Sequence, residues 1–492
     1  MTEQDLIASR REKLARIRSR GVEPFPNRFH RTHTMAEVRE PHKDLAPGTR
    51  TEEEVHVAGR LMSFRKMGKV AFADLGDLTG RVQLYASRDV LGEEGLEAFT
   101  TEVDLGDILG AWGVVMTTRK GELSVELTGF QLLAKALRPP PEKWHGLQDV
   151  EKRYRQRAQD LMSRAKAREV IMRRALILRA MRAFLQEQGF VEVETPVLQP
   201  LPGGATARPF VTHHNTLDKD LYLRVAPELY LKRLLVGGLE KVYELGKSFR
   251  NEGVSTEHNP EFTSLEAYQA YADYRDAMDL TEALVERCAV AVHGVTRLQY
   301  QGREMDFTRP WRRVPLLEAV ATSTGVDVER PLGELVGELE RRGVVVPDHL
   351  RQGPKGKVLE HLLETRVRQD LWNPTFVVDF PRDISPLAKR KPGQDDLVER
   401  FELYIAGREV ANAFSELNDP DEQRARFADQ DQLRGAGDEE AQRTDEEFLT
   451  DLELGMPPAA GVGIGVDRLV MSLVDAASIR EVIAFPLVGE RR

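Results

Sequence analysis

Cysteine is almost absent from this sequence: Cys288 is the only one among 492 residues. A single cysteine excludes an intramolecular disulfide and a cysteine-rich zinc site, and it favours a reducing compartment. The sequence also lacks an apolar run long enough to span a membrane. Its first residues, with Glu3 and Asp5, lack the apolar core of a signal peptide. We therefore predict a cytoplasmic protein with no membrane partner.

Two common nucleotide-binding signatures are missing as well. No P-loop sequence occurs, and no G-x-G-x-x-G motif opens a helix. Beyond residue 222, strand-like and helix-like segments mix without a βαβ rhythm. These absences argue against a Rossmann or P-loop nucleotide site.

The composition that remains is typical of a globular protein, with 41% hydrophobic and 30% charged residues. The length predicts two or three domains. The net charge of −10 does not suggest a nucleic-acid partner, but local patches decide binding in a multidomain protein. One basic patch lies at residues 10–20, where Lys13, Arg16 and Arg20 share a helical face. A solvated helix and an RNA-contacting helix both fit that patch.

Short strand-like segments follow one another between residues 55 and 135, with turn formers such as Gly68 and Gly121 between them. The segments are Val55–Arg60, Val70–Leu75, Val82–Ala86, Ile108–Met116 and Ser124–Leu127. This series of short strands predicts a small β-barrel, for which the OB-fold is the commonest candidate.

A proline run at 139–141 marks the end of this domain, and a charged connector follows it. Between Glu169 and Gln188, apolar residues recur at intervals of three and four, which predicts a helix. Gly189 ends that helix, and a strand follows at 190–193. We predict an α+β protein in four parts: a basic helical extension (1–54), an OB-fold barrel (55–140), a linker (141–168) and a larger domain (169–492).

Residues 243–271 predict an antiparallel hairpin with a long loop at 253–260. Side chains alternate between the two faces of a strand, so residues two apart share a face. The residues that share faces in this way are Arg250 with Glu252, and Phe262 with Glu266 and Tyr268. If both faces point the same way, one surface carries a cation, carboxylates and aromatic rings, which a core would not select. A solvated strand face is the alternative.

Alternating glycines mark a second segment, Gly461 to Arg468, which precedes an apolar helical run. Glycine at every second position leaves one strand face bare, and a flat group such as a purine could lie against it. Arg468 would then lie at the start of the helix, over that group. Close strand–helix packing is the alternative.

A third segment, 401–418, combines acidic and aromatic residues. Glu402 and Glu409 could hold a divalent cation, since magnesium prefers a few carboxylates together with substrate phosphates. Strict alternation places Glu409 opposite Asn412, so either a bulge intervenes or one assignment fails. An exposed acidic strand is the alternative. One face of the strand holds Asn412, Phe414 and Glu416.

Together these segments resemble the three signature motifs of class II aminoacyl-tRNA synthetases. The helix 169–188 through Pro196 is similar to motif 1, the sequence 249–252 with its loop to motif 2, and 461–468 to motif 3. From about residue 55 onward the chain resembles lysyl-tRNA synthetases more closely, in the segments 202–210, 226–233, 258–263 and 385–389. The resemblance implies an OB-fold anticodon-binding domain and a class II catalytic domain, built on an antiparallel sheet flanked by helices. It also implies a homodimer formed through the motif 1 helix and strand.

The resemblance implies a reaction and a set of site residues. Lysine and ATP would form lysyl-adenylate, with magnesium on Glu402 and Glu409, and lysine would pass to the 3′ end of tRNA-Lys. Arg250 and Arg468 are the expected catalytic residues. The expected ATP-binding residues are Arg250, Glu252, His258, Asn259, Phe262 and Arg468. The expected lysine-binding residues are Gly204, Glu228, Arg250, Glu266, Tyr268, Asn412, Phe414 and Glu416.

Charge supports lysine as the amino acid. Glu228, Glu266 and Glu416 are three carboxylates for one small ligand; left unpaired, they would repel one another and be costly to bury. A substrate with two ammonium groups resolves this. We expect Glu416 and Tyr268 at the ε-ammonium, Glu266 and the Gly204 carbonyl at the α-ammonium, and Glu228 at either end.

In the barrel, the resemblance implies an anticodon site. A phenylalanine can stack on an unpaired base, and a glutamine matches the edge of a uridine, which suits the reading of single-stranded bases. For Phe72, a place in the barrel core is the alternative. The expected anticodon-binding residues are Arg65, Phe72, Gln83 and Glu122.

Two positions separate this chain from some relatives. Aspartyl- and asparaginyl-tRNA synthetases usually have lysine at the position of Leu231, so aspartate is disfavoured here. Many relatives have arginine at Glu257, where it helps to hold the triphosphate; we predict that His258, magnesium or another cation compensates. Two alternative functions are a protein-lysylating enzyme, which residues 55–135 argue against, and a catalytically idle RNA-binding paralogue. The retained Arg250 argues against the second, as do Glu252 and Arg468.

Overall fold

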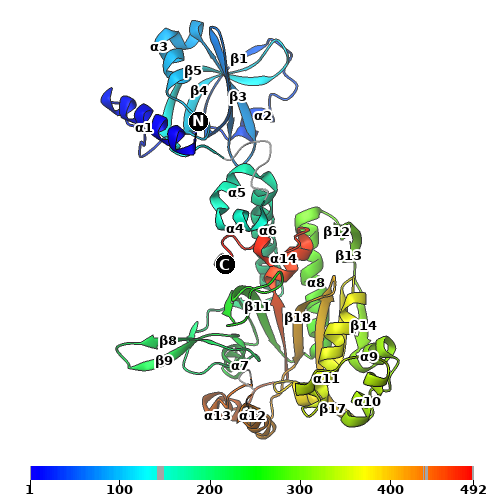
Figure 1. Ribbon diagram of the computed structural model, residues 1–492. Helices are drawn as coiled ribbons and strands as arrows, with labels where there is room; N and C mark the ends of the chain where they lie inside the picture. The colour runs from blue at the N-terminus through cyan, green and yellow to red at the C-terminus, as the bar shows by residue number, and fades with distance from the viewer. Residues whose placement is uncertain (1, 141–148, 436, 438–440, 490–492) are drawn as a thin grey trace. The chain divides into compact units, whose positions relative to one another are not determined.

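The computed structural model describes residues 2–140, 149–435, 437 and 441–489. The chain divides into two compact units, Met1–Gln148 and Asp149–Arg492, whose elements are labelled in Figure 1. Within the described ranges, no helix is both long and apolar enough to cross a membrane. Of the expected linker 141–168, residues 141–148 lie outside the described residues. The rest belongs to the larger unit, where it forms helices α4 (Val150–Arg155) and α5 (Arg157–Ser163) and the start of α6.

The smaller unit is a closed five-stranded barrel, as the sequence predicts, and its strand order is β1-β2-β3-β5-β4. Alternate strand residues point inward: Val55 and Val57 of β1 and Val82 and Leu84 of β3 are buried in one apolar cluster. Strand β1 begins at Arg50, before the expected boundary. The strands are β1 (Arg50–Met67), β2 (Val70–Gly76), β3 (Arg81–Ser87), β4 (Ile108–Thr117) and β5 (Leu123–Ala134), and the helices are α1 (Glu3–Ser19), α2 (Met35–Arg39) and α3 (Arg88–Thr101).

The basic helix α1 begins with a capping box, in which Thr2 and Asp5 satisfy each other's backbone N–H groups. Part of its predicted basic face forms ion pairs within the smaller unit. Lys13 Nζ lies 2.6 Å from Asp104 Oδ1, and Arg20 pairs with Glu102. Two of the three cations on that face therefore hold α1 against neighbouring residues of its own unit.

The larger unit is built on one mixed sheet with strand order β14-β15-β17-β18-β19-β11-β10-β6, and β16 pairs with β17. The central strands are antiparallel, whereas the outer pairs β14–β15 and β10–β6 are parallel. The strands are β6 (Val191–Glu192), β10 (Lys241–Phe249), β11 (Glu261–Ala270), β14 (Arg312–Pro315), β15 (Thr375–Pro381), β16 (Arg390–Lys391), β17 (Gln394–Ile405), β18 (Arg408–Ser415) and β19 (Ala459–Gly465). This confirms the predicted α+β fold with an antiparallel sheet.

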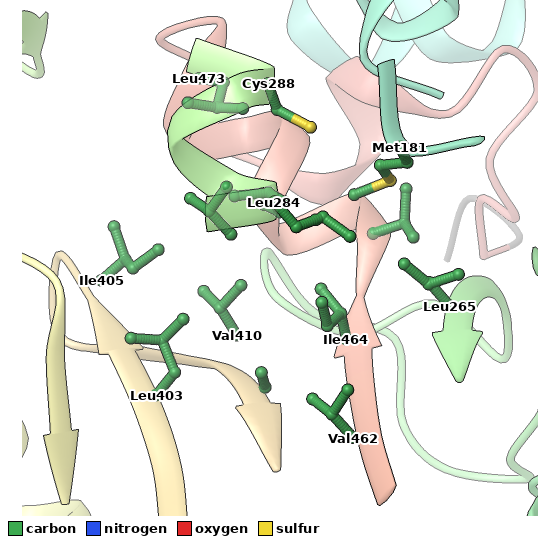
Figure 2. Packing of buried hydrophobic residues seen from close by; sticks show 14 of the residues in the cluster. Met181, Leu265, Leu284, Cys288, Leu403, Ile405, Val410, Val462, Ile464 and Leu473 are labelled. Atoms are coloured by element: carbon green, nitrogen blue, oxygen red, sulfur yellow. The ribbon is translucent and has the colours of Figure 1, made fainter. Parts of the chain in front are cut away.

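Helices pack against one face of this sheet and form the main core with it. The predicted motif 1 helix is α6 (Ala165–Glu187), and Gly189, at φ +82°, follows its last turn. Figure 2 shows Leu284 and Cys288 of α8 (Tyr274–His293) over the sheet residues Val410 and Ile464. Helices α14 (Val466–Leu473) and α15 (Ile479–Val482) belong to the same core.

Two further groups of elements pack around the sheet. One group forms a separate apolar cluster with β15, and consists of α9 (Leu316–Thr324), α10 (Leu332–Arg341) and α11 (Lys355–Leu362). Another consists of α7 (Glu228–Val236) and α13 (Glu446–Glu453), beside α12 (Pro420–Gly435). The short strands outside the main sheet are β7 (Leu198–Gln199), β8 (Phe210–His214), β9 (Lys219–Leu223), β12 (Arg297–Tyr300) and β13 (Arg303–Asp306).

Candidate active site

A cavity of about 430 Å³ opens over the face of the sheet formed by β10, β11, β18 and β19. Its wall brings together every residue predicted for ATP, lysine and magnesium except Glu416. These residues come from five segments of the sequence: the loop at Gly204, the start of α7, the β10–β11 hairpin, the strands β17 and β18, and the start of α14. The fold therefore assembles the predicted site in one place.

The β10–β11 hairpin positions an arginine and an aromatic ring at one end of the cavity. Phe249 pairs with Glu261 across the two strands, and Arg250 follows directly, with its N–H donating to Pro260 O at 2.9 Å. The Arg250 guanidinium carbon lies 5.2 Å from the centre of the Phe262 ring. Its Nε is buried and has no hydrogen-bond partner among the described residues. A buried, unpartnered guanidinium donor that faces a cavity is suited to bind an anion.

Arg468 lies across the same end of the cavity, at the start of α14. Its Nη1 donates to Glu409 O at 2.8 Å, and its Nη2 donates to His258 Nε2 at 3.1 Å. Burial and the charge of Arg468 lower the pKa of His258, so this histidine is neutral at pH 7 and accepts that hydrogen bond. Asp467 fixes the start of α14, because its Oδ2 accepts the Thr263 N–H at 2.8 Å.

Between the two arginines, strand β19 is bare at Gly463 and Gly465, as its alternating glycines predict. The prediction fails at Gly461, because Glu416 and Tyr268 cover that glycine. A methyl group on Gly463 would meet only Glu266 Cγ at 3.7 Å and Asn412 O at 3.8 Å, which are ordinary contacts. Gly461, Gly463 and Gly465 all line the cavity. A flat group can therefore lie on this strand between Arg250 and Arg468.

A bulge in β18 brings Glu409 to the cavity wall. Leu403 pairs with Ala411 and Tyr404 with Glu409, so Val410 is the extra residue. The bulge that the sequence requires is therefore present. Because of it, Glu409 and Asn412 line the same cavity despite their odd spacing.

Glu402 lies on the neighbouring strand β17 and is buried. Arg400 Nη2 donates to its Oε1 at 2.6 Å, and the Tyr404 hydroxyl donates to its Oε2 at 2.9 Å. Burial, opposed by Arg400 and reinforced by Glu409, raises the pKa of Glu402 to about 8. Among the described residues, no group of three or more His, Cys, Asp or Glu side chains could hold a metal.

The opposite end of the cavity is acidic and buried. Glu266 is 7% exposed, and the Tyr268 hydroxyl donates to its Oε2 at 3.2 Å. Burial and the nearby charge of Glu228 raise the pKa of Glu266 to about 8. Burial also raises the pKa of Glu228, against the opposing charge of Lys232. This end favours a cationic ligand, which would restore the ionised carboxylates.

Glu416 lies behind the cavity wall and not on it. It is 1% exposed, and its carboxylate lies against Gly461 and beside Tyr268. Its partner is Lys232, whose Nζ is 2.5 Å from Glu416 Oε2 and 2.7 Å from Glu228 Oε1. The premise that three carboxylates meet here unpaired is therefore wrong, because a lysine of the chain itself neutralises part of their charge.

Sequence reasoning missed Lys232, although a signal for it exists. Lys232 follows Glu228 by four residues on one helix, the spacing at which opposite charges pair. Arg400 was also missed; it lines the cavity, and besides Glu402 its Nε donates to Asn412 Oδ1 at 3.1 Å. No pattern in the sequence marks Arg400, because its partners are set by strand pairing.

The cation that compensates Glu257 is Arg408. Arg408 Nε donates to Glu257 Oε1 at 3.0 Å, and Arg368 Nη1 lies 3.9 Å from Glu257 Oε2. Arg408 is itself held by Tyr300, whose hydroxyl accepts from its Nη1 at 2.6 Å. A backbone hydrogen bond also holds the loop: the Ile479 N–H donates to Thr256 O at 2.8 Å. The acidic residue therefore ties this loop to β18.

In the barrel, Phe72 points away from the core. Its neighbours Ala71 and Ala73 are buried inside, whereas Phe72 is half-buried on the other face of β2. Arg65, paired with it across β1 and β2, places its guanidinium carbon 5.8 Å from the ring centre. Gln83 Oε1 accepts from Ser124 Oγ at 3.0 Å. Glu122 is exposed in the turn that precedes β5.

A mixed sheet with two arginines lining one cavity, preceded in the chain by an OB-fold barrel, defines a class II aminoacyl-tRNA synthetase. A family model described as tRNA synthetases class II (D, K and N) matches residues 149–489, and one described as an OB-fold nucleic acid binding domain matches residues 55–133. The chain belongs to this class II family, and among its members it is similar to the lysine–tRNA ligases.

Three of these relatives show how far the similarity extends. The lysine–tRNA ligase of Carboxydothermus hydrogenoformans is 51% identical over 99% of this chain and 98% of its own length. That of Pelotomaculum thermopropionicum is 52% identical over 99% of this chain and 95% of its own. That of Moorella thermoacetica is 52% identical over 98% of both chains. The family resemblance read from the sequence is confirmed, and similarity across both domains does not favour a paralogue without the barrel.

Proposed function

We propose that this protein is a lysine–tRNA ligase that activates lysine with ATP and transfers it to the 3′ end of tRNA-Lys. The observation that carries the proposal is the polarity of one cavity. Two arginines and a bare glycine strand lie at one end, and buried glutamates lie at the other. A nucleotide fits the first end, a small cation fits the second, and the groups that must react would meet between them.

At the nucleotide end, Arg250 would contact both the ATP α-phosphate and the lysine carboxylate, since its planar fork suits two anions that must be brought together. Phe262 and Arg468 would enclose the adenine against the glycine strand. Glu252, His258 and Asn259 would contact the adenine or the phosphates. The support is that all these side chains line the cavity and that Arg250 Nε is buried without a partner among the described residues.

Activation needs no covalent protein nucleophile. The lysine carboxylate attacks the α-phosphate in line, a bond to the pyrophosphate breaks, and lysyl-adenylate forms. The terminal hydroxyl of tRNA then attacks the adenylate and releases AMP. Positioning of the two substrates and neutralisation of the developing charge by Arg250 and Arg468 are sufficient sources of catalysis.

Glu402 and Glu409 would hold magnesium together with the phosphates of ATP. Both carboxylates line the cavity beside Arg468, and two carboxylates completed by phosphates and water are a common magnesium site. The ion would supply charge neutralisation at the phosphates. Arg400 and Tyr404 orient Glu402, which leaves Glu409 as the more accessible of the two ligands.

At the amino-acid end, Glu266 and the Gly204 carbonyl would hold the α-ammonium, and Glu416 with Tyr268 the ε-ammonium, with Glu228 at either. Glu416 is buried beside Gly461 and Tyr268, so its carboxylate would reach the ligand next to that glycine. Asn412 and Phe414 would complete the wall around the aliphatic chain.

The remaining proposals concern the partners of the protein. Arg65, Phe72, Gln83 and Glu122 would contact the anticodon on the outer face of the barrel. A homodimer would form through α6 and β6, because exposed apolar side chains lie on β6 and in the residues that follow it, and such patches mark interfaces. Val191, Val197 and Leu198 are 50%, 41% and 48% exposed. A tRNA substrate and a single buried cysteine fit a cytoplasmic enzyme.

Pyrophosphate exchange into ATP tests the proposed function. We expect exchange that depends on lysine and on magnesium and does not occur with aspartate or asparagine, and we expect aminoacylation of tRNA-Lys in the same preparation. Exchange driven by aspartate in place of lysine would refute the assignment. Exchange with lysine, together with lysylation of a protein but not of tRNA, would favour the protein-modifying alternative.

Replacing Glu257 with arginine is expected to raise the KM for ATP by roughly three- to tenfold. The substitution removes the ion pair between Glu257 and Arg408, and it places a third guanidinium beside Arg408 and Arg368. Initial rates of exchange at varied ATP measure this. Glu261→Arg is the matched control: it makes the same charge change in the same hairpin, where Glu261 pairs only weakly with Lys247 at 3.4 Å. Tighter ATP binding by Glu257→Arg would contradict the role assigned to Arg408.

A further inference from the structure

The amino-acid end of the cavity contains a lysine of the protein itself, and no step described above uses it. Lys232 is fully buried on α7. Its Nζ bridges Glu228 Oε1 at 2.7 Å and Glu416 Oε2 at 2.5 Å, and it lies 5.3 Å from the centre of the Phe414 ring. One ammonium group therefore joins a carboxylate on the cavity wall to a carboxylate behind it.

We propose that Lys232 is a resident counter-cation of the amino-acid end, and that it positions Glu228 and Glu416 and favours their ionised forms when the substrate binds. The proposal deepens the proposed function and rests on it. Lys232 does not line the cavity, so it is a positioning residue that acts through the two glutamates.

A count of charges supports this role. The groups that would surround the bound lysine are the negative Glu228, Glu266 and Glu416 and the positive Lys232, together with Arg250, whose guanidinium would contact the lysine carboxylate from the nucleotide end. One negative charge therefore remains. Free lysine has two ammonium groups and one carboxylate, so it carries one positive charge. With Lys232 present, the pocket and its ligand are neutral together; without Lys232, one buried negative charge would stay uncompensated, which is costly.

The other charged groups around this end are already paired. Arg224 Nη1 on one side lies 2.5 Å from Glu244 Oε1. Arg400 Nη2 on β17 lies 2.6 Å from Glu402 Oε1. The only hydroxyl that titrates nearby among the described residues, Tyr268, stays protonated, because burial and its acidic neighbours raise its pKa well above the ordinary value. These groups do not replace Lys232 as the partner of Glu228 and Glu416.

Protonation gives the proposal a measurable consequence. Burial raises the pKa of both Glu228 and Glu416, and Lys232 opposes that rise in each case. If the charge of Lys232 is removed, both pKa values rise further, so the carboxylates hold protons that a bound ammonium must displace. Lysine binding then weakens at neutral pH and recovers as the pH increases.

The chain provides a matched control in its other unit. Lys135 is also a buried lysine between two carboxylates: its Nζ lies 2.6 Å from Asp104 Oδ2 and 2.7 Å from Asp107 Oδ2. It belongs to the smaller unit and is not among the residues that line the cavity. Loss of the Lys135 charge should reduce the thermal stability of the protein without any effect on the KM for lysine.

The experiment measures the KM for lysine between pH 6.5 and 8.5 by pyrophosphate exchange, in the full-length wild type, Lys232→Gln, Lys232→Arg and Lys135→Gln. In the wild type the KM for lysine should fall as the pH approaches 8, where Glu266 ionises. In Lys232→Gln the KM for lysine at pH 7 should rise by roughly tenfold or more, because each unit added to the pKa of Glu228 or Glu416 costs about a factor of ten. The pH range over which this KM decreases should also move to higher pH. The KM for ATP should not change. Lys232→Arg should keep the wild-type pH profile, because it keeps the charge.

Two results would overturn the inference. One is a wild-type lysine KM and pH profile in Lys232→Gln; the other is the same shifted profile in Lys135→Gln. If Lys232→Gln does not fold, Lys232→Arg decides: a charge-retaining variant that folds but shows the shifted profile also overturns it. A wild type without lysine-dependent exchange would instead refute the proposed function and the inference together, so the two failures can be distinguished.

Discussion

Replacing Arg250 with alanine is expected to abolish the formation of lysyl-adenylate and to leave the fold intact. The guanidinium lies over Phe262, and its Nε is buried without a partner among the described residues. No other part of the structure therefore depends on that donor. Loss of a donor placed where charge develops costs on the order of 10²–10³ in rate, and Arg250 would serve two anions at once. We expect a loss of about 10³-fold or more in exchange activity.

Single-turnover formation of the adenylate measures this loss directly, and a thermal melt confirms that the protein is folded. Arg250→Lys keeps the charge but not the planar fork, so it should recover only a small part of the activity. Arg233→Ala is the control, because it removes an arginine of the same unit that pairs with Asp451 at 2.5 Å and lies outside the cavity wall. Activity of Arg250→Ala within tenfold of the wild type would contradict the role given to Arg250.

Local patterns predicted those parts of the fold that local physics determines. Inward-facing residues alternate along the barrel strands, and the hairpin pairs Phe249 with Glu261 around its long loop. The odd spacing of Glu409 and Asn412 required a bulge, which is present at Val410. In each case the information lies within one element or between two neighbouring strands.

Contacts between distant elements could not be predicted in this way. Whether Glu416 reaches the cavity depends on how β18, β19 and α7 pack, and a one-dimensional pattern does not contain that packing. The same holds for Glu257, whose partner Arg408 lies on another strand. Charge alone indicated that the three glutamates need a cation and assigned it to the ligand, whereas Lys232 of the chain itself pairs with two of them. At Glu257 the expected partner was His258, magnesium or another cation, and Arg408 is that other cation.

Replacing Gly461 with alanine is expected to raise the KM for lysine by roughly 100-fold and to leave the KM for ATP within about threefold of the wild type. A methyl group there would fall well inside van der Waals contact with Glu416 Oε1 and with the ring of Tyr268. Neither neighbour can move easily: Lys232 holds Glu416, and Tyr268 is 3% exposed. Overpacking of such a site costs about 1–3 kcal/mol, and each 1.4 kcal/mol is a factor of ten in affinity.

Gly463→Ala is the control that separates the two ends of the cavity. Gly463 lies on the same face of the same strand, but its methyl group would meet protein atoms only at 3.7 Å and beyond. We therefore expect Gly463→Ala to keep the thermal stability of the wild type and to weaken the binding of ATP, because the methyl group would occupy the surface proposed for the purine. Two results would show that the amino-acid end does not lie where Gly461, Glu416 and Tyr268 meet. One is a wild-type KM for lysine in Gly461→Ala, and the other is an equal rise of the KM for ATP and the KM for lysine in both variants.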